Sequence, residues 1–264
     1  MPTASATVQV MIDAARRAAR GLLRDFGEVA ELQVSKKGTA DYVSAADTKA
    51  EQVLVDALSK ARPGYGFLAE ERGLVEGTDK THVFIIDPLD GTTNFLHSIP
   101  YFAINIALER EGQIVAAVTY NPVAGEMFWA ERGKGAYLND RRIRVAARTQ
   151  LIESVLATGI PFAGRVGHAQ FLKELHQIAQ RVSGVRRFGS ASLDLAWCAA
   201  GRVDGYWERN LGAWDIAAGT LLVTEAGGRV TSAEGAPIDV RQGSVCAANH
   251  ELHSQVLDLL KLAR

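Results

Sequence analysis

The spacing of apolar residues predicts two helices in the first quarter of the chain. Over residues 7–31 apolar side chains return every three or four positions, as on the buried face of an amphipathic helix. Residues 32–43 are polar and contain glycine, so we expect a mobile loop there. Ser44 and Asp47 match a capping box, and the helix that it opens should run to about Ala61.

The apolar period changes to two between residue 81 and about residue 147, which indicates strands. Apolar residues alternate over 102–108, and a glycine-containing turn then leads into the apolar run 114–118, a pattern that predicts an antiparallel hairpin. Shorter strands are predicted near 127–130 and 136–138.

Helical and strand patterns alternate in the remainder of the chain. The predicted elements are a helix over 167–182, a strand around 185–188, a helix over 190–200, a strand over 203–208 and helices over 214–226 and 250–263. No internal repeat or low-complexity linker interrupts the sequence, so we expect a single domain over 1–264. Its N-terminal α+β part should cover about 1–147 and its C-terminal α/β part about 148–264. The expected class is α+β, with helices layered on largely antiparallel sheet.

Composition excludes several classes of function. Of the 264 residues 47% are hydrophobic and 22% are charged, and the net charge is −1, which gives no global electrostatic case for binding nucleic acid or an acidic membrane. Cys198 and Cys246 are isolated, which fits reduced thiols better than a disulfide framework or a zinc pair. No signal peptide is visible and no stretch approaches the roughly 18 apolar residues of a membrane helix. We therefore expect a cytoplasmic protein.

Carboxylates in three segments could jointly hold divalent metal ions. An apolar, β-branched run ends in Asp87, Pro88 blocks continuation of the strand, and Asp90 begins a turn, so two acids can converge on one point. Glu70 precedes this strand and Asp215 follows Trp214 later in the chain. Hard oxygen ligands of this kind suit Mg²⁺, which takes the rest of its coordination shell from water and substrate phosphate. The pattern outlines a metal-assisted phosphatase.

Each of these acids also has a plainer explanation when it is taken alone. Asp47 completes a helix cap, Glu70 could belong to a solvated surface pair, and Asp90 could simply belong to a turn. Asp215 could be an acid favoured by the helix dipole in a first turn. The metal interpretation therefore depends on all of them occurring together.

Two longer motifs carry a resemblance to a known family. The segment Asp87–Phe95, DPLDGTTNF, and the segment Trp214–Gly219, WDIAAG, followed by Glu225–Gly228, resemble the two signatures of inositol monophosphatases of the bacterial type. These enzymes belong to the lithium-sensitive, Mg²⁺-dependent phosphatase superfamily. The similarity also runs through residues 41–51, Glu70, Gly189–Ala191 and Glu208, so that it covers nearly the whole chain. It implies a layered α/β/α/β/α fold, usually a homodimer, and inhibition by lithium.

The resemblance also implies two to three Mg²⁺ ions and their ligands. Glu70, Asp87 and the Leu89 carbonyl resemble one site, and Asp87, Asp90 and Asp215 resemble a second. A third, weaker ion would again use Glu70. Two such ions neutralise the dianionic phosphate ester and make a hydroxide nucleophile available near neutral pH, so no phosphoenzyme is needed.

The remaining site residues are likewise carried by the resemblance. Glu70, Thr92 and Asp47 match the catalytic set, in which Thr92 takes a proton from the attacking water and gives its own to Asp47. We expect Gly91 and Thr92 to begin a helix whose N–H groups face the phosphate. The implied substrate-binding residues are Asp90, Gly91, Thr92, Gly189, Ser190, Ala191, Glu208 and Asp215.

The expected reaction is hydrolysis of myo-inositol 1-phosphate, with alternatives left open. The same metal site would serve histidinol phosphate, fructose 1,6-bisphosphate or NADP. Residues 159–162 lack the hydroxyl residue of the animal enzymes, which leaves the fine substrate preference undecided. Another alternative is a regulatory protein that binds transcription or translation machinery, for which Arg186 or Arg187 at a dimer face could serve.

Overall fold

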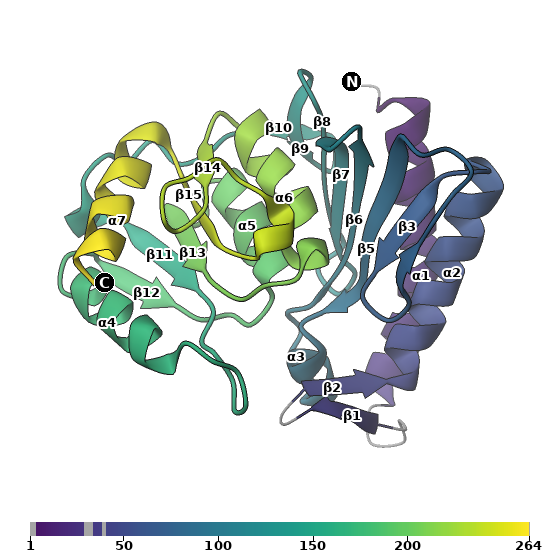
Figure 1. Cartoon of the computed structure of the whole chain (residues 1–264), viewed down its shortest axis with the longest axis horizontal. Coiled ribbons are helices and arrows are strands. Elements are labelled where there is room, and N and C mark those ends of the chain that lie inside the picture. The colour runs from purple at the N-terminus through teal and green to yellow at the C-terminus, as the bar shows by residue number, and fades with distance from the viewer. Residues whose placement is uncertain (1–3, 29–33, 39–40, 264) are drawn as a thin grey trace.

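The chain folds into five alternating layers of helix and sheet (Figure 1). The computed structural model describes residues 4–28, 34–38 and 41–263. For residues 34–38 and 41–44 it describes the backbone alone. Its α-helices are α1 (Ala6–Gly27), α2 (Ala45–Ala61), α3 (Thr92–Leu96), α4 (His168–Ala179), α5 (Ala191–Ala199), α6 (Ala213–Glu225) and α7 (His250–Leu262). From one side to the other the layers are α1 with α2, a large sheet, α5 with α6, a smaller sheet, and α4 with α7. This arrangement confirms the predicted fold class.

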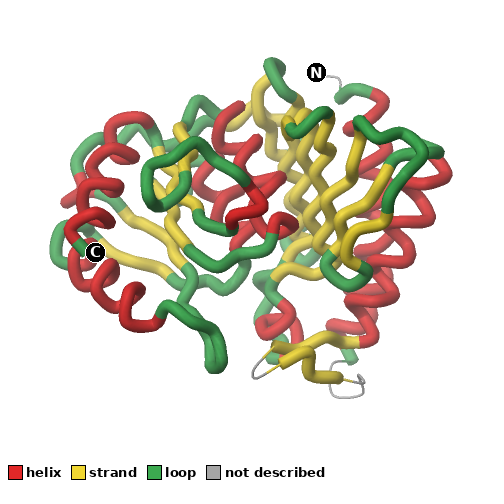
Figure 2. Tube along the Cα trace, in the orientation of Figure 1, coloured by secondary structure: helices red, strands yellow, loops and turns green. Residues whose placement is uncertain are grey.

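The larger sheet is almost entirely antiparallel. Its strands are β3 (Gly66–Ala69), β4 (Gly73–Val75), β5 (His82–Asp90), β6 (Ala103–Arg110), β7 (Gln113–Asn121), β8 (Glu126–Glu131), β9 (Gly135–Leu138) and β10 (Arg141–Ile143). They lie in the order β10-β9-β8-β7-β6-β5-β3-β4, and the β3–β5 pair is parallel. The predicted hairpin is the β6–β7 pair. Figure 2 shows these strands as the long ladder beside α1 and α2.

The smaller sheet is mixed, although antiparallel pairs predominate over the two sheets together, as expected. Its strands are β11 (Val155–Thr158), β12 (Gly184–Arg186), β13 (Gly205–Glu208), β14 (Arg229–Thr231) and β15 (Val245–Ala248). They lie in the order β12-β11-β13-β15-β14, and β11 is parallel to both of its neighbours. Parallel neighbours need long crossover connections. Here α4 lies between β11 and β12, and α5 lies between β12 and β13.

The middle layer joins the two sheets through one apolar core. Nearly every residue of α5 and most residues of α6 are buried, as expected for helices covered by sheet on both sides. Ile85 of the larger sheet and Tyr206 of the smaller one belong to the same buried cluster as Leu195 and Ile216 of these helices. The loops at one end of this layer can therefore combine residues from both halves of the chain.

Two predictions for the N-terminal region need correction. The segment expected to be a mobile loop contains strands β1 (Val34–Gly38) and β2 (Asp41–Ser44), which pair antiparallel with a shift in register. The first helix ends at Gly27 rather than at residue 31, and the positions after Glu28 lie outside the described residues. The side chain of Ser44, which the capping box requires, also lies outside them.

Candidate active site

A bulge in β5 brings two acids to one point. Residues three apart on a regular strand face opposite sides of the sheet. In β5, however, Asp87 pairs with Asn105 and Asp90 pairs with Ala103, so the register shifts between the two acids. Such a bulge turns side chains out of their regular alternation. The strand prediction was wrong in one respect, because Pro88 interrupts the ladder without ending the strand.

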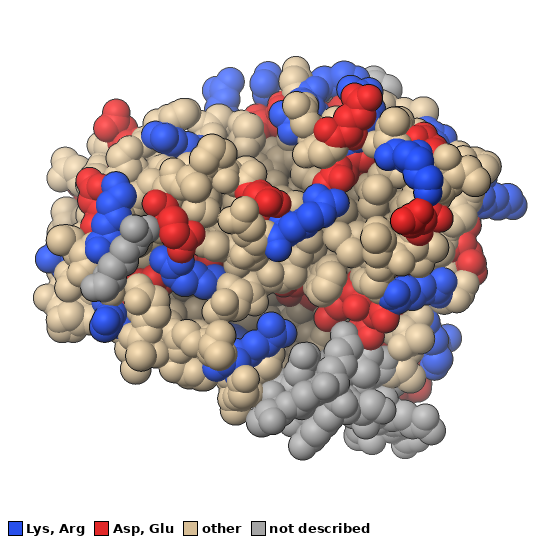
Figure 3. Space-filling model, in the orientation of Figure 1, with Lys and Arg blue, Asp and Glu red and all other residues tan. Residues whose placement is uncertain are grey.

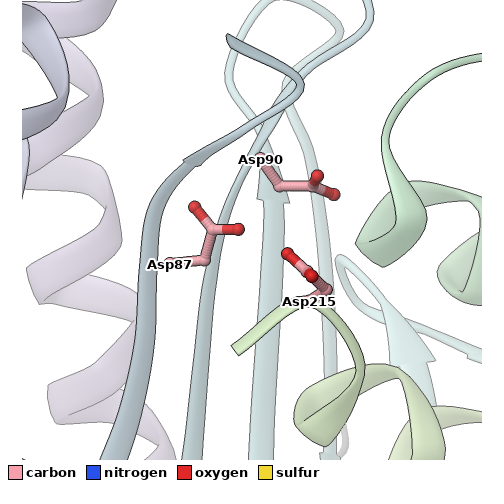
Figure 4. Close-up of side chains that lie close together, drawn as sticks. All are labelled: Asp87, Asp90 and Asp215. Atoms are coloured by element: carbon pink, nitrogen blue, oxygen red, sulfur yellow. The ribbon is translucent and has the colours of Figure 1, made fainter. Parts of the chain in front are cut away.

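Asp215 completes the cluster from the other half of the chain. It lies in the first turn of α6, and its Oδ2 accepts a 2.6 Å hydrogen bond from the backbone N–H of Gly212. One oxygen from each of Asp87, Asp90 and Asp215 lies within 4.8 Å of the others. Figure 4 shows the three carboxylates converging from β5 and α6.

The cluster is an unfavourable place for negative charge. Burial raises the pKa of Asp87 well above its usual value, and the charges of Glu70, Asp90 and Asp215 raise it further. Burial and then the charges of Asp90 and Glu70 raise the pKa of Asp215 in the same way. Buried like charges require a compensating cation or a proton. A divalent ion with oxygen ligands fits the residues that are present.

Hydrogen bonds hold Asp90 in place against this repulsion. Burial raises the pKa of Asp90, but donors from the other half of the chain oppose the shift. Its Oδ2 accepts bonds from Ser190 Oγ at 2.6 Å, from Ser192 N at 2.8 Å and from Ser192 Oγ at 2.5 Å. Ser192 was missed in the sequence, where its place two residues after Ser190 at a predicted helix start was the available signal.

Thr92 and Asp47 lie beside the cluster. The Thr92 hydroxyl lies 3.2 Å from Oδ1 of Asp47 and 3.1 Å from the Leu89 carbonyl oxygen. Since a hydroxyl carries one proton, Thr92 can donate to only one of these acceptors at a time. Asp47 is buried on α2 and Leu89 is buried on β5, so this arrangement joins two elements of the N-terminal part.

Glu70 adds a fourth acid next to the cluster, from the end of strand β3. It follows β3 directly, and its backbone N–H donates to the Ile86 carbonyl at 3.1 Å. Because β3 and β5 are parallel, Glu70 and Asp87 come after aligned strand residues at the same edge of the sheet. Glu70 lines the pocket described next, whereas Asp87 is 1% exposed and lies behind the lining.

A pocket of about 500 Å³ opens beside the acids. Its lining includes the sequence-predicted residues Glu70, Asp90, Gly91, Thr92, Gly189, Ser190, Ala191, Glu208 and Asp215. Asp47, Asp87 and Leu89 are not among the lining residues. On the visible face of the molecule, basic and acidic side chains are interspersed (Figure 3).

Gly91 shapes the wall nearest the acids. Its φ of 95° lies in the left-handed region, which favours glycine. A Cβ at this position would lie 3.1 Å from the Tyr101 carbonyl oxygen and 3.3 Å from the Gly189 carbonyl oxygen. Gly91 caps the start of α3, which is only five residues long, so the predicted helix start at Thr92 is present.

Further polar groups at the pocket and directly behind its lining were not predicted as site residues from the sequence. Asp194 is 1% exposed and accepts a 2.8 Å hydrogen bond from the Tyr101 hydroxyl. The Tyr206 hydroxyl donates to Oε2 of Glu208, and Arg187 lines the pocket near both acids. The signal for Tyr206 was its place two residues before Glu208 in a predicted strand, which puts both side chains on one face.

Buried carboxylates beside a pocket in a layered fold fit the class of metal-dependent phosphatases. The sequence matches the inositol monophosphatase family over residues 4–262, and the chain belongs to that family. This finding confirms the family and the phosphoric monoester hydrolase class predicted from the sequence.

Similar proteins of known name cover almost the whole chain. An inositol-1-monophosphatase of Caulobacter vibrioides is 66% identical over 256 residues, which are 96% of this chain and 100% of that protein. The Nus factor SuhB of Pseudomonas aeruginosa is 40% identical, with 96% of this chain and 97% of that protein covered. A crystal structure of the extragenic suppressor protein suhB from Bartonella henselae superposes with a TM-score of 0.95 at 55% identity, covering 97% of this chain and 99% of the other.

Proposed function

We propose that this protein hydrolyses myo-inositol 1-phosphate to inositol and phosphate with the help of Mg²⁺. The observation that carries the proposal is the convergence of Asp87, Asp90 and Asp215 beside a pocket large enough for a small sugar-like substrate. The 66% identical relative named inositol-1-monophosphatase supports this substrate.

The acidic residues would hold the metal ions. Glu70, Asp87 and the Leu89 carbonyl would hold one ion, Asp87, Asp90 and Asp215 a second, and Glu70 a third. Bound there, Mg²⁺ would neutralise the phosphate ester and lower the pKa of the attacking water. Asp87 is the residue common to the first two ligand sets, so its carboxylate would fix how the two are arranged.

Thr92 and Asp47 would move the proton of the attacking water. The Thr92 hydroxyl already lies within hydrogen-bond distance of Asp47 Oδ1. Thr92 Oγ1 would accept the proton from water while its own hydroxyl proton passes to Asp47. Asp47 would act through Thr92, because it lies behind the pocket lining.

The pocket walls would hold the substrate at both ends. The backbone N–H groups after Asp90, at Gly91 and Thr92, would face the phosphate. The segment Gly189–Ala191 and the Glu208 carboxylate would face the hydroxyl groups of the ring, since both line the pocket on the wall formed by the C-terminal part.

Phosphate release from a panel of esters tests this function. Inositol 1-phosphate, histidinol phosphate, fructose 1,6-bisphosphate and NADP would be compared with and without Mg²⁺, beside the Asp87→Asn variant. We expect Mg²⁺-dependent turnover led by inositol 1-phosphate and lost in the variant. Turnover led by another ester would reassign the substrate, and turnover that survives in Asp87→Asn would contradict the metal assignment.

Inhibition by lithium, a homodimer and a cytoplasmic location are also part of the proposal. The two buried, unpaired cysteines fit a reducing compartment. Within the described part of the chain no helix is long and apolar enough to cross a membrane. Inhibition by millimolar Li⁺, the molar mass in solution by light scattering, and cell fractionation test the three points separately.

A regulatory role is a second candidate. Relatives that are 40% identical carry the name Nus factor SuhB, which favours the sequence-based alternative of contact with transcription machinery. If this role is real, the purified protein should co-elute with host transcription elongation complexes, and the Asp87→Asn variant should do so equally well. Separate elution of both proteins would exclude it.

A further inference from the structure

Tyr206 and Glu208 form a hydrogen-bonded pair at the end of β13. Alternate residues of a strand point to the same side of the sheet, so the tyrosine lies beside the glutamate on one face. The Tyr206 hydroxyl donates a hydrogen bond to Oε2 of Glu208. Tyr206 is 1% exposed, whereas Glu208 is partly exposed and lines the pocket. The hydroxyl therefore approaches the carboxylate from the protein side and leaves the pocket side open.

Small side chains on the two neighbouring strands leave room for the Tyr206 ring. In the register of the smaller sheet, Tyr206 lies between Ala157 of β11 and Ala247 of β15. Both neighbours are small and fully buried, so a large ring fits between them in one position. The hydroxyl at the end of a rigid, buried ring is a fixed donor.

Gly159 also helps to hold the Glu208 carboxyl group, both by leaving space for it and by donating a hydrogen bond to it. A Cβ at this position would lie 1.8–2.1 Å from the carboxyl atoms of Glu208, so the Glu208 side chain can occupy its place only because residue 159 is glycine. The backbone N–H of Gly159 also donates to this carboxylate. Two donors, one in β13 and one in the loop that follows β11, thus hold the Glu208 carboxyl.

The groups around Glu208 have opposing effects on its pKa. Burial raises the pKa of Glu208 to about 7, against the Tyr206 hydrogen bond, which lowers it. The charge of Asp90 raises this pKa as well, while Arg187 and the Gly159 N–H lower it. Asp194 of α5 and Asp215 of α6 are further acids that interact with the Glu208 charge.

We propose that Tyr206 is a positioning residue that holds the Glu208 carboxylate as a hydrogen-bond acceptor for substrate hydroxyl groups, and so makes this enzyme selective for polyhydroxylated phosphate monoesters. The inference rests on the proposed phosphatase function. A phosphate ester without hydroxyl groups has nothing to donate to Glu208, so Tyr206 should have no influence on how well it is cleaved. Tyr206 acts through Glu208 and does not touch the substrate.

The test is the ratio of kcat/KM for inositol 1-phosphate to kcat/KM for p-nitrophenyl phosphate, measured against pH with Mg²⁺ present. Ionisation of the phosphate group or of the metal site changes kcat/KM for both substrates in a similar way, so its effect largely cancels in the ratio. In the wild type the ratio should rise with pH as Glu208 ionises, because only the ionised carboxylate is a full hydrogen-bond acceptor for the substrate hydroxyl groups. Tyr206→Phe removes a bond that lowers the pKa of Glu208, so the rise should move to higher pH. At neutral pH the ratio should fall by about tenfold.

Tyr101→Phe is the matched control. It removes another tyrosine hydroxyl that donates to an acid of the pocket lining, here Asp194 instead of Glu208. We expect it to leave the ratio and its pH dependence within about twofold of the wild type. Glu208→Gln should lower the ratio at least as far as Tyr206→Phe, and adding Tyr206→Phe to Glu208→Gln should change nothing further.

The outcomes separate this inference from the proposed function. If the wild type cleaves neither ester, the proposed function is wrong and the inference is overturned with it. Wild-type turnover together with an equal loss on both esters in Tyr206→Phe overturns only the inference, because the tyrosine would then be merely structural. Additive effects of Tyr206→Phe and Glu208→Gln would overturn it as well.

Discussion

Two groups of buried acids in this protein differ in what neutralises them. In one group each carboxylate has an arginine: Arg148 Nε lies 2.8 Å from Asp204 Oδ1, and Arg209 Nε lies 2.7 Å from Glu174 Oε1. In the cluster at the active site, by contrast, Asp87, Asp90 and Asp215 have no lysine or arginine nitrogen within 4 Å among the described residues. A buried carboxylate thus has a positively charged partner in one region, whereas in the other region the described residues provide none.

The difference separates stability from function. An acid paired with arginine and backbone donors can stabilise the fold by itself. A cluster of acids without a cation lowers the stability of the folded chain, and such a site persists when function requires it. We therefore expect substitutions in the two regions to have opposite consequences.

The largest effect is expected for Asp87→Asn. The substitution keeps the shape of the side chain but removes the charge shared by the two proposed metal sites, so kcat should fall by on the order of a thousandfold. Steady-state phosphate release measures it. Asp204→Asn is the control, since it alters an equally buried acid that has an arginine partner. Comparable losses in both variants would remove the distinction between the two regions.

Mg²⁺ should stabilise the wild type and not Asp87→Asn. At a concentration of about one hundred times its Kd, a bound ion adds about 3 kcal/mol to the free energy of unfolding. Thermal unfolding with and without Mg²⁺ measures the shift. The metal-free variant should be at least as stable as the metal-free wild type, because it relieves repulsion. An equal rise of Tm in both proteins would place the ion elsewhere.

Asp204→Ala should destabilise the fold without changing catalysis. The Asp204 carboxylate is fully buried and accepts hydrogen bonds from Arg148 and from the backbone N–H of Val155 at the start of β11. Its removal leaves that N–H without its carboxylate acceptor, which should cost about 2 kcal/mol. Urea unfolding gives the free energy, and kcat/KM of the folded variant should match the wild type. A selective loss of kcat would tie this pair to the active site.

The smallest effect concerns His253, a buried base for which the described part of the chain provides no acidic hydrogen-bond partner. Burial and the nearby charge of Arg229 lower the pKa of His253 to about 4, and its Nε2 lies 3.0 Å from the Thr231 hydroxyl. In the unfolded chain a histidine titrates near 6.5, so the unfolded state binds more protons between these values. Stability should therefore be full above about pH 6.5 and decline as the pH falls towards 4.

Urea unfolding at several pH values, with His253→Gln for comparison, measures this contribution. The variant lacks the titrating ring, so its stability should fall less steeply over the same window. Parallel curves for the two proteins would show that His253 does not account for the decline.

The residues that carry local chemistry could be predicted from the sequence. The motif around Asp87 and Asp90 and the later Trp214-Asp215 pair identified the acids, since their residue types and order suffice to match a family. The helices with strong period, such as α1 and α4, were also predicted, with errors of one to several residues at their ends. The residue at which a helix ends depends on local competition between capping residues and turns. The spacing of apolar residues alone does not show where this competition ends the helix.

Other features had no readable signal because they depend on partners far away in the sequence. Strands β3, β11 and β15 were not predicted, since short apolar runs gain their strand form from the neighbours that pair with them. The β1–β2 pair replaced an expected loop for the same reason. Ser192 became a partner of Asp90 only when α5 was brought against β5.

The sequence alone thus determined which groups are available: acids for metal ions, a hydroxyl beside Asp47, and a family with a known layered fold. Only the tertiary structure decided which buried acids receive an arginine and which lie together with no lysine or arginine beside them among the residues that are described. It also decided that Gly159 leaves room for Glu208 and that Tyr206 holds it. The physical reason is that charge compensation and close packing depend on distances between segments, and those distances exist only once the two sheets have closed on the helices between them.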